Sequence, residues 1–124
     1  MTRFRFYALT VLLSGIVGIA ILGQLRSSGI EVIVENRDPS PLKSLVLHVT
    51  GASYPLGDVP PGAVVAKRVS PTGESHLEIE FTGADGKPRR LDAGGYFEPG
   101  YRGTIRLTIC DHEIATNQQT IKRR

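Results

Sequence analysis

A chain of 124 residues has room for one compact domain once an apolar N-terminal stretch is set aside, which excludes two soluble domains. The sequence pI of about 9.3 suggests a nucleic-acid partner, but the excess positive charge does not lie in the part of the chain that would form the domain. All 12 acidic residues lie in 31–124, together with twelve of the 15 Lys and Arg, so this part is formally neutral. The excess comes from Arg3, Arg5 and Arg26, which flank the apolar stretch, so membrane topology explains the basicity and no nucleic-acid partner is expected.

The stretch 6–25 contains twenty residues without a charge, and a helix of that length is about 30 Å long, the thickness of the hydrocarbon core of a bilayer. We therefore expect a transmembrane signal-anchor helix. The alternative is a cleaved secretory signal, with small-residue sites at 18–20 and 27–29. The first site lies inside the apolar stretch and the second lies beyond its end, so an uncleaved anchor is favoured.

The cations predict the orientation of this anchor. Arg3 and Arg5 precede the segment and only Arg26 follows closely, so residues 1–5 are expected to form a short cytoplasmic tail. Residues 26–29 are then a linker, and residues 30–124 form an extracytoplasmic domain, periplasmic if the source is bacterial. Small residues on the segment allow close approach of another helix, and they are Ser14, Gly15 and Gly18.

Beyond residue 29 the pattern changes to an alternation of apolar and polar residues, which is typical of strands with one buried face. The expected strands are 30–36, 43–50, 62–69, 75–82, 87–92, 103–110 and 113–121, with a possible short one at 52–56. The expected core residues on two of them are Leu77, Ile79, Phe81, Ile105, Leu107 and Ile109.

Turn-forming residues separate these strands at short intervals. Proline fixes φ, glycine accepts a positive φ, and Asp85-Gly86 is typical of a tight hairpin. Short strands at this spacing predict an all-β fold. We expect an antiparallel β-sandwich of immunoglobulin-like architecture with about seven short strands, preceded by the transmembrane helix. A small closed barrel is the alternative.

Motifs for catalysis or cofactor binding are not found, so neither an enzyme nor a cofactor is expected. Residues 83–88 (GADGKP) resemble a phosphate loop only superficially, because the glycine spacing differs and proline follows the lysine. A hairpin turn is the better interpretation. His112-Glu113 opens like a zinc-protease motif, but Thr116 stands where the second histidine is needed.

A metal site is the less favoured possibility. Cys110 and His112 would share a face if their strand continued unbroken. His48 and His76 both lie on the polar phase of their strands, so they would meet if those strands were neighbours.

Aromatic side chains near glycine and proline are candidate binding anchors, although the favoured interpretation is that they fold back over the ends of the domain. The predicted partner contacts are Tyr96, Phe97, Tyr101 and Arg102, with Tyr54 as a further loop aromatic. Two basic patches, 87–90 and 122–124, are interpreted as protection of strand edges, or else as docking sites for an acidic partner or anionic headgroups.

These observations predict a membrane-tethered protein-interaction or accessory subunit. Its partners are expected to be the bilayer and another membrane protein. The alternative is an extracytoplasmic domain that binds a metal or another small ligand.

Overall fold

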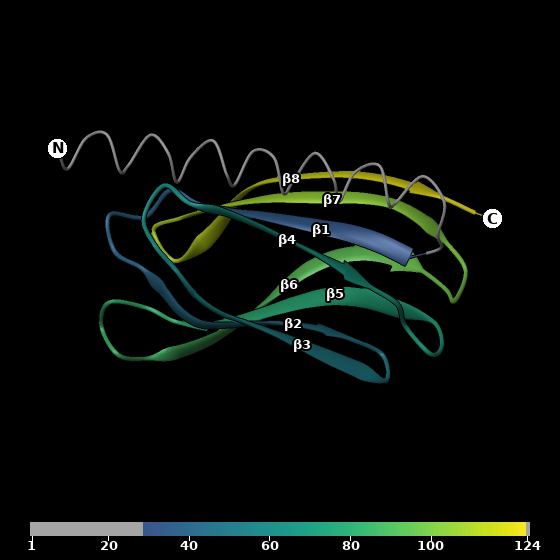
Figure 1. Ribbon diagram of the computed structural model, residues 1–124, viewed down its shortest axis with the longest axis horizontal. Helices are drawn as coiled ribbons and strands as arrows, with labels where there is room; N and C mark the ends of the chain where they lie inside the picture. The colour runs from purple at the N-terminus through teal and green to yellow at the C-terminus, as the bar shows by residue number, and fades with distance from the viewer. Residues whose placement is uncertain (1–28, 124) are drawn as a thin grey trace, which may run out of the picture.

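The computed structural model describes residues 29–123, and these residues form eight β-strands (Figure 1). The strands are β1 (Gly29–Asn36), β2 (Leu42–Val49), β3 (Ala52–Val59), β4 (Val64–Val69), β5 (Ser75–Thr82), β6 (Pro88–Phe97), β7 (Arg102–Cys110) and β8 (Glu113–Lys122). The all-β prediction is confirmed. The uncertain strand at 52–56 is a full strand, so there are eight strands where about seven were expected.

The strands form two four-stranded sheets, in the orders β4-β1-β7-β8 and β3-β2-β5-β6. Most neighbouring strands are antiparallel, but β1 and β7 are parallel over their whole paired length. The expectation of a purely antiparallel sandwich is therefore wrong at this pair. An alternating pattern marks the buried face of a strand but gives no information on the direction of its neighbour.

The strand order also differs from that of an immunoglobulin domain, in which the first two strands are neighbours in one sheet. Here β1 and β2 lie in opposite sheets, because the loop after Asn36 carries the chain across the sandwich. The two-sheet sandwich agrees with the prediction, whereas the sequence alone gives no prediction of the strand order.

One apolar core lies between the two sheets. All six predicted core residues are at most 1% exposed, and the inward side chains of β1 and β2 are also buried. Phe81 and Phe97 are the largest of the fully buried side chains. Burial of a Leu, Ile or Phe side chain contributes about 1.5–3 kcal/mol, so this core is the main source of stability in a domain whose single cysteine is free.

Polar bonds between the sheets close both sides of the sandwich. On one side the Tyr54 hydroxyl accepts a hydrogen bond from the Ser70 amide (3.0 Å), which joins β3 to the end of β4. On the other side, Asn117 and Gln119 of β8 donate side-chain hydrogen bonds to the Ala93 carbonyl on β6, at 2.7 and 2.9 Å. Ala93 sits at a shift in the β5–β6 register, which leaves its carbonyl free to bond across the sandwich.

The predicted anchor helix 6–25, its packing residues Ser14, Gly15 and Gly18, the tail 1–5 and linker residues 26–28 all lie outside the described residues. Within 29–123 the structure contains no helix that is long and apolar enough to cross a bilayer.

Candidate interaction surfaces

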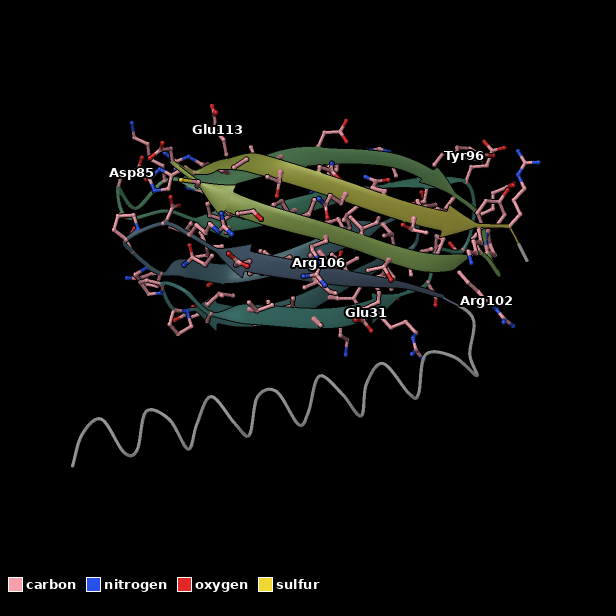
Figure 2. The ribbon with its side chains drawn as sticks, turned by 90° about the horizontal axis from the view of Figure 1, so that it is seen from above. Glu31, Asp85, Tyr96, Arg102, Arg106 and Glu113 are labelled. Atoms are coloured by element: carbon pink, nitrogen blue, oxygen red, sulfur yellow. The ribbon has the colours of Figure 1, made fainter. Side chains whose placement is uncertain are left out.

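The two ends of the sandwich differ in the loops and side chains that they present. We use the name entry end for the end formed by Gly29, the β2–β3 turn, residues 70–74, residues 98–101 and the end of β8. The opposite end, called the far end, carries residues 37–41, 60–63, 83–87 and the Asp111-His112 turn. Figure 2 shows Tyr96 and Arg102 at the entry end and Asp85 and Glu113 at the far end.

The chain joins the sandwich at the entry end. The Gly29 amide donates a hydrogen bond to the Tyr101 carbonyl (3.0 Å), and Gly29 is in register with Arg102 on β7. The first described residue is therefore fixed beside two of the predicted partner contacts.

The predicted aromatic contacts are separated by the structure. Strand β6 continues through Gly94-Gly95, both at positive φ, so Tyr96 and Phe97 belong to a strand and not to a loop. Phe97 points inward and is fully buried, so it is a core residue and is withdrawn as a surface contact. Tyr96 is 53% exposed. Tyr101 is half-buried against the core, and its hydroxyl donates to the Glu98 carboxylate (2.9 Å).

Charged and aromatic groups surround a hollow at the entry end. The hollow has a volume of about 370 Å³ and is lined by Glu98, Pro99, Tyr101 and Arg123. Partial desolvation, with Glu74 and Glu98 nearby, raises the pKa of the Tyr96 phenol above its ordinary value. Tyr96 therefore stays neutral at physiological pH and presents an uncharged amphipathic ring.

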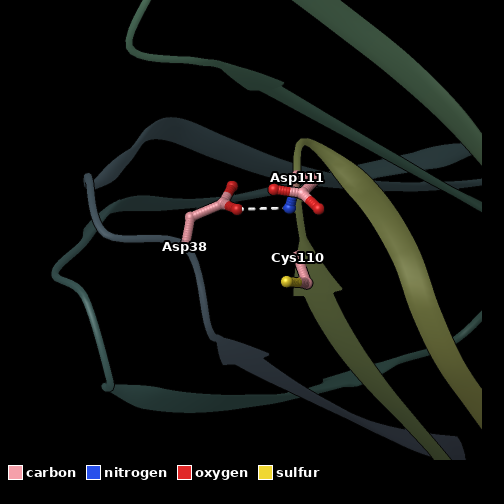
Figure 3. Close-up of side chains that lie close together, drawn as sticks. All are labelled: Asp38, Cys110 and Asp111. Carbon is pink, nitrogen blue, oxygen red and sulfur yellow. Dashed lines mark hydrogen bonds between the residues drawn. The ribbon is translucent and has the colours of Figure 1, made fainter.

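The far end contains a buried carboxylate that holds the β7–β8 turn. Asp38 is 3% exposed, and its carboxylate accepts the backbone amide of Asp111 (Figure 3). It also accepts the backbone amide of His112, at 3.3 Å. Asp111 and His112 have φ of 53° and 60°, as a two-residue type I′ hairpin turn requires. Asn36 accepts the Asp38 amide (2.9 Å), which fixes the carboxylate in place.

This turn changes the position of two predicted metal ligands. Strand β7 ends at Cys110, so Cys110 and His112 do not share the face of an unbroken strand. The ligand atoms of Asp38, Cys110 and Asp111 lie within 4.8 Å of one another. Since the Asp38 carboxylate already accepts two turn amides, its position is explained by the hairpin alone.

The other two predicted metal ligands lie on the outer face of the second sheet. Strands β2 and β5 are neighbours, and His48 is in register with Glu78, two residues from His76. Each histidine nevertheless has its own carboxylate partner. His48 bonds Glu80 and His76 bonds Glu78, both at 2.7 Å. His48 and His76 therefore have separate carboxylate partners on this face, and Cys110 and His112 lie away from them at the β7–β8 turn.

The basic patch at 87–90 is largely neutralised by carboxylates. Arg89 binds Asp85 within the β5–β6 turn, and Arg90 binds Glu78 across the strands. The arginine is the main reason that the pKa of Asp85 is lowered, with a hydrogen bond from the Lys87 amide second. The hairpin predicted at Asp85-Gly86 is confirmed, since the Gly86 amide donates to the Gly83 carbonyl.

The four edge strands differ in how they are protected against pairing with another strand. Strand β3 contains Pro55 and an irregular register, and β4 is short and carries an exposed Lys67. Strand β6 begins with Pro88 followed by two arginines. Strand β8 is ten residues long, and its interior 114–121 contains no charge, proline or glycine. Its outer backbone groups lack these forms of protection, although the Asn117 and Gln119 side chains of the same strand bond across to β6.

Sequence reasoning identified neither the Asp38 carboxylate nor the β8 edge as features of interest. The uncharged run 114–121 is visible in the sequence, but its position at a sheet edge is not. Comparisons with protein-family models and with curated proteins find no match for this chain.

Proposed function

We propose that this chain is a single-pass membrane protein, anchored by segment 6–25, whose extracytoplasmic β-sandwich acts without catalysis as an interaction or accessory subunit of a membrane complex. The Ser14, Gly15 and Gly18 face of the anchor and the domain itself both contact the partner, another membrane protein. Two weak contacts on one chain reinforce each other, because binding at the first raises the effective concentration at the second.

The unprotected edge of β8 carries this proposal. A strand at a sheet edge offers a row of backbone donors and acceptors that an extended segment of a partner can pair with. Exposed Thr116, Gln118 and Thr120 add neutral polar groups beside that row. An uncharged strand interior as long as 114–121 is unusual at the edge of a domain that acts alone, whereas it suits a subunit whose edge is covered by a partner.

Site-specific crosslinking in native membranes tests the proposal. A photoreactive amino acid at Gln118 should give a discrete crosslinked product with another membrane protein. The same group at Val64, which is 39% exposed on β4 at the opposite edge of the same sheet, should not. Equal products from both positions, or none from Gln118, would contradict the proposal.

A charged edge provides a second variant. Thr116→Lys combined with Gln118→Lys should abolish the crosslink from Thr120 while the thermal midpoint changes little, because both side chains are exposed. A crosslink that survives these charges would mean that β8 is not the pairing edge.

Binding of a metal or small ligand is the alternative function. Titration of the purified protein with copper and zinc separates the two proposals. Tight stoichiometric binding that is lost in His48→Ala, His76→Ala or His112→Ala would favour the alternative.

A further inference from the structure

We infer that the entry end of the sandwich rests on the headgroups of the bilayer that holds the anchor, and that anionic lipids are its ligand. The inference rests on the membrane anchor of the proposed function. It assigns Tyr96, Tyr101 and Arg102 to the lipid surface in place of the partner protein.

The position of Gly29 limits the distance between the domain and the membrane. Gly29 is fixed to Tyr101 at the entry end, and four residue steps separate it from Leu25, the last residue of the apolar segment. Four extended residues span at most about 14 Å. The entry end therefore lies within the depth of the headgroup region, about 5–8 Å on each side of the hydrocarbon core, or directly above it.

The chemistry of this end fits such a surface. Tyr96 is 53% exposed and uncharged, and tyrosine is enriched at the level of lipid headgroups. The same end carries three exposed cations, Arg102, Lys122 and Arg123, whereas Glu74 and Glu98 lie near Tyr96. The three cations outnumber the two carboxylates, so this end carries a net positive charge that attracts lipid phosphates.

The far end has the opposite character. Its carboxylates outnumber its cations: Asp58, Asp85, Asp111 and Glu113 lie there with Lys43 and Lys87, and its arginines 37 and 89 are paired with Glu35 and Asp85. An anionic surface would repel this end. The ten residues of β6 run between the two ends, so the far end stands about 30 Å from the entry end. With the entry end on the lipid, the strands stand upright and the β8 edge faces sideways, toward a neighbouring membrane protein.

A tryptophan reporter tests this orientation in the full-length protein, which has no tryptophan of its own. Tyr96→Trp and Glu113→Trp place one reporter at each end. Both proteins are reconstituted in vesicles of phosphatidylglycerol and phosphatidylcholine that contain a lipid with a nitroxide on its headgroup. We expect quenching of Trp fluorescence to be at least twofold stronger for the reporter at 96 than for the reporter at 113.

Charge reversal tests the lipid chemistry. In the Tyr96→Trp background, Arg102→Glu with Lys122→Glu should reduce quenching in vesicles with phosphatidylglycerol to the level seen in phosphatidylcholine alone. The matched far-end pair, Lys43→Glu with Lys87→Glu, should leave it unchanged. If the reporter at 96 is quenched equally in vesicles with and without phosphatidylglycerol, anionic lipid is not the ligand of this end.

Extraction with alkaline carbonate distinguishes a failure of this inference from a failure of the membrane anchor on which it rests. If the protein stays in the membrane and both reporters are quenched equally, this inference alone is wrong. If carbonate releases the protein, the anchor and this inference are both wrong.

Discussion

Asp38 accepts a hydrogen bond from the backbone amide of Asp111, a residue 73 positions away along the chain. This bond ties the loop after β1 to the β7–β8 turn. We predict that Asp38→Ala lowers the free energy of unfolding by about 1–3 kcal/mol, because it leaves two turn amides without their acceptor. Urea denaturation measures the loss.

Asp111→Asn is the control for this change, since asparagine tolerates the positive φ of the turn and the backbone amide is retained. It should alter stability by less than about 0.5 kcal/mol. An Asp38→Ala protein as stable as the parent would show that the carboxylate does not hold the turn.

Truncation of the core should be severe. Phe81 is 1% exposed between the sheets, and replacing a buried phenylalanine by alanine costs about 3–5 kcal/mol. A domain of this size has a total free energy of unfolding of about 5–15 kcal/mol, so this loss removes a large part of it. Phe81→Ala should therefore be unfolded or nearly unfolded. The comparison is His76→Ala on the exposed face of the same strand, which circular dichroism should show to melt close to the parent.

The bonds between β8 and β6 should also be measurable. Asn117→Ala with Gln119→Ala leaves the Ala93 carbonyl without its two side-chain donors. We expect a loss of about 1–3 kcal/mol by urea denaturation. Gln118→Ala, which changes the intervening outward residue, should have almost no effect. If the Asn117→Ala, Gln119→Ala double variant is as stable as Gln118→Ala, these bonds do not stabilise the sandwich.

Acid should weaken the Asp85–Arg89 pair. The pKa of Asp85 is lowered in the folded state, mainly by Arg89, so its contribution to stability is present above the unfolded value near 4 and is lost as the pH falls toward the folded pKa. The difference in melting temperature between the parent and Asp85→Asn should therefore shrink from pH 7 to pH 2. Arg89→Gln should reproduce the effect, whereas a constant difference would contradict it.

The sequence predicted the core and most strand boundaries because alternation is a local signal. Leu77, Ile79 and Phe81 alternate with polar residues and are all buried. Strand β3 was predicted only in part, since Pro55 and Gly57 resemble loop residues, although they are tolerated at a sheet edge. The β6 strand was ended too early because Gly94-Gly95 resembles a turn, whereas the strand continues through these residues with a register shift on each side of the Leu77–Gly94 pair.

Long-range relationships could not be predicted in the same way. The parallel pairing of β1 with β7 and the contact of Asp38 with the distant turn depend on the three-dimensional order of the strands. The separation of Cys110 from His112 depends on two non-glycine residues adopting a positive φ, which the tertiary contact to Asp38 stabilises. For the same reason the β8 edge is recognised only when all eight strands are in place.

The central claim is that segment 6–25 remains attached and holds the sandwich at a membrane. Intact-mass spectrometry of the protein in the membrane fraction, after an alkaline carbonate wash, tests this claim most directly. We predict that the protein stays in the pellet with a mass that includes Arg3, Arg5 and the whole of 6–25. A released protein whose mature N-terminus is Ile21 or Ile30 would show a cleaved signal and contradict the anchor.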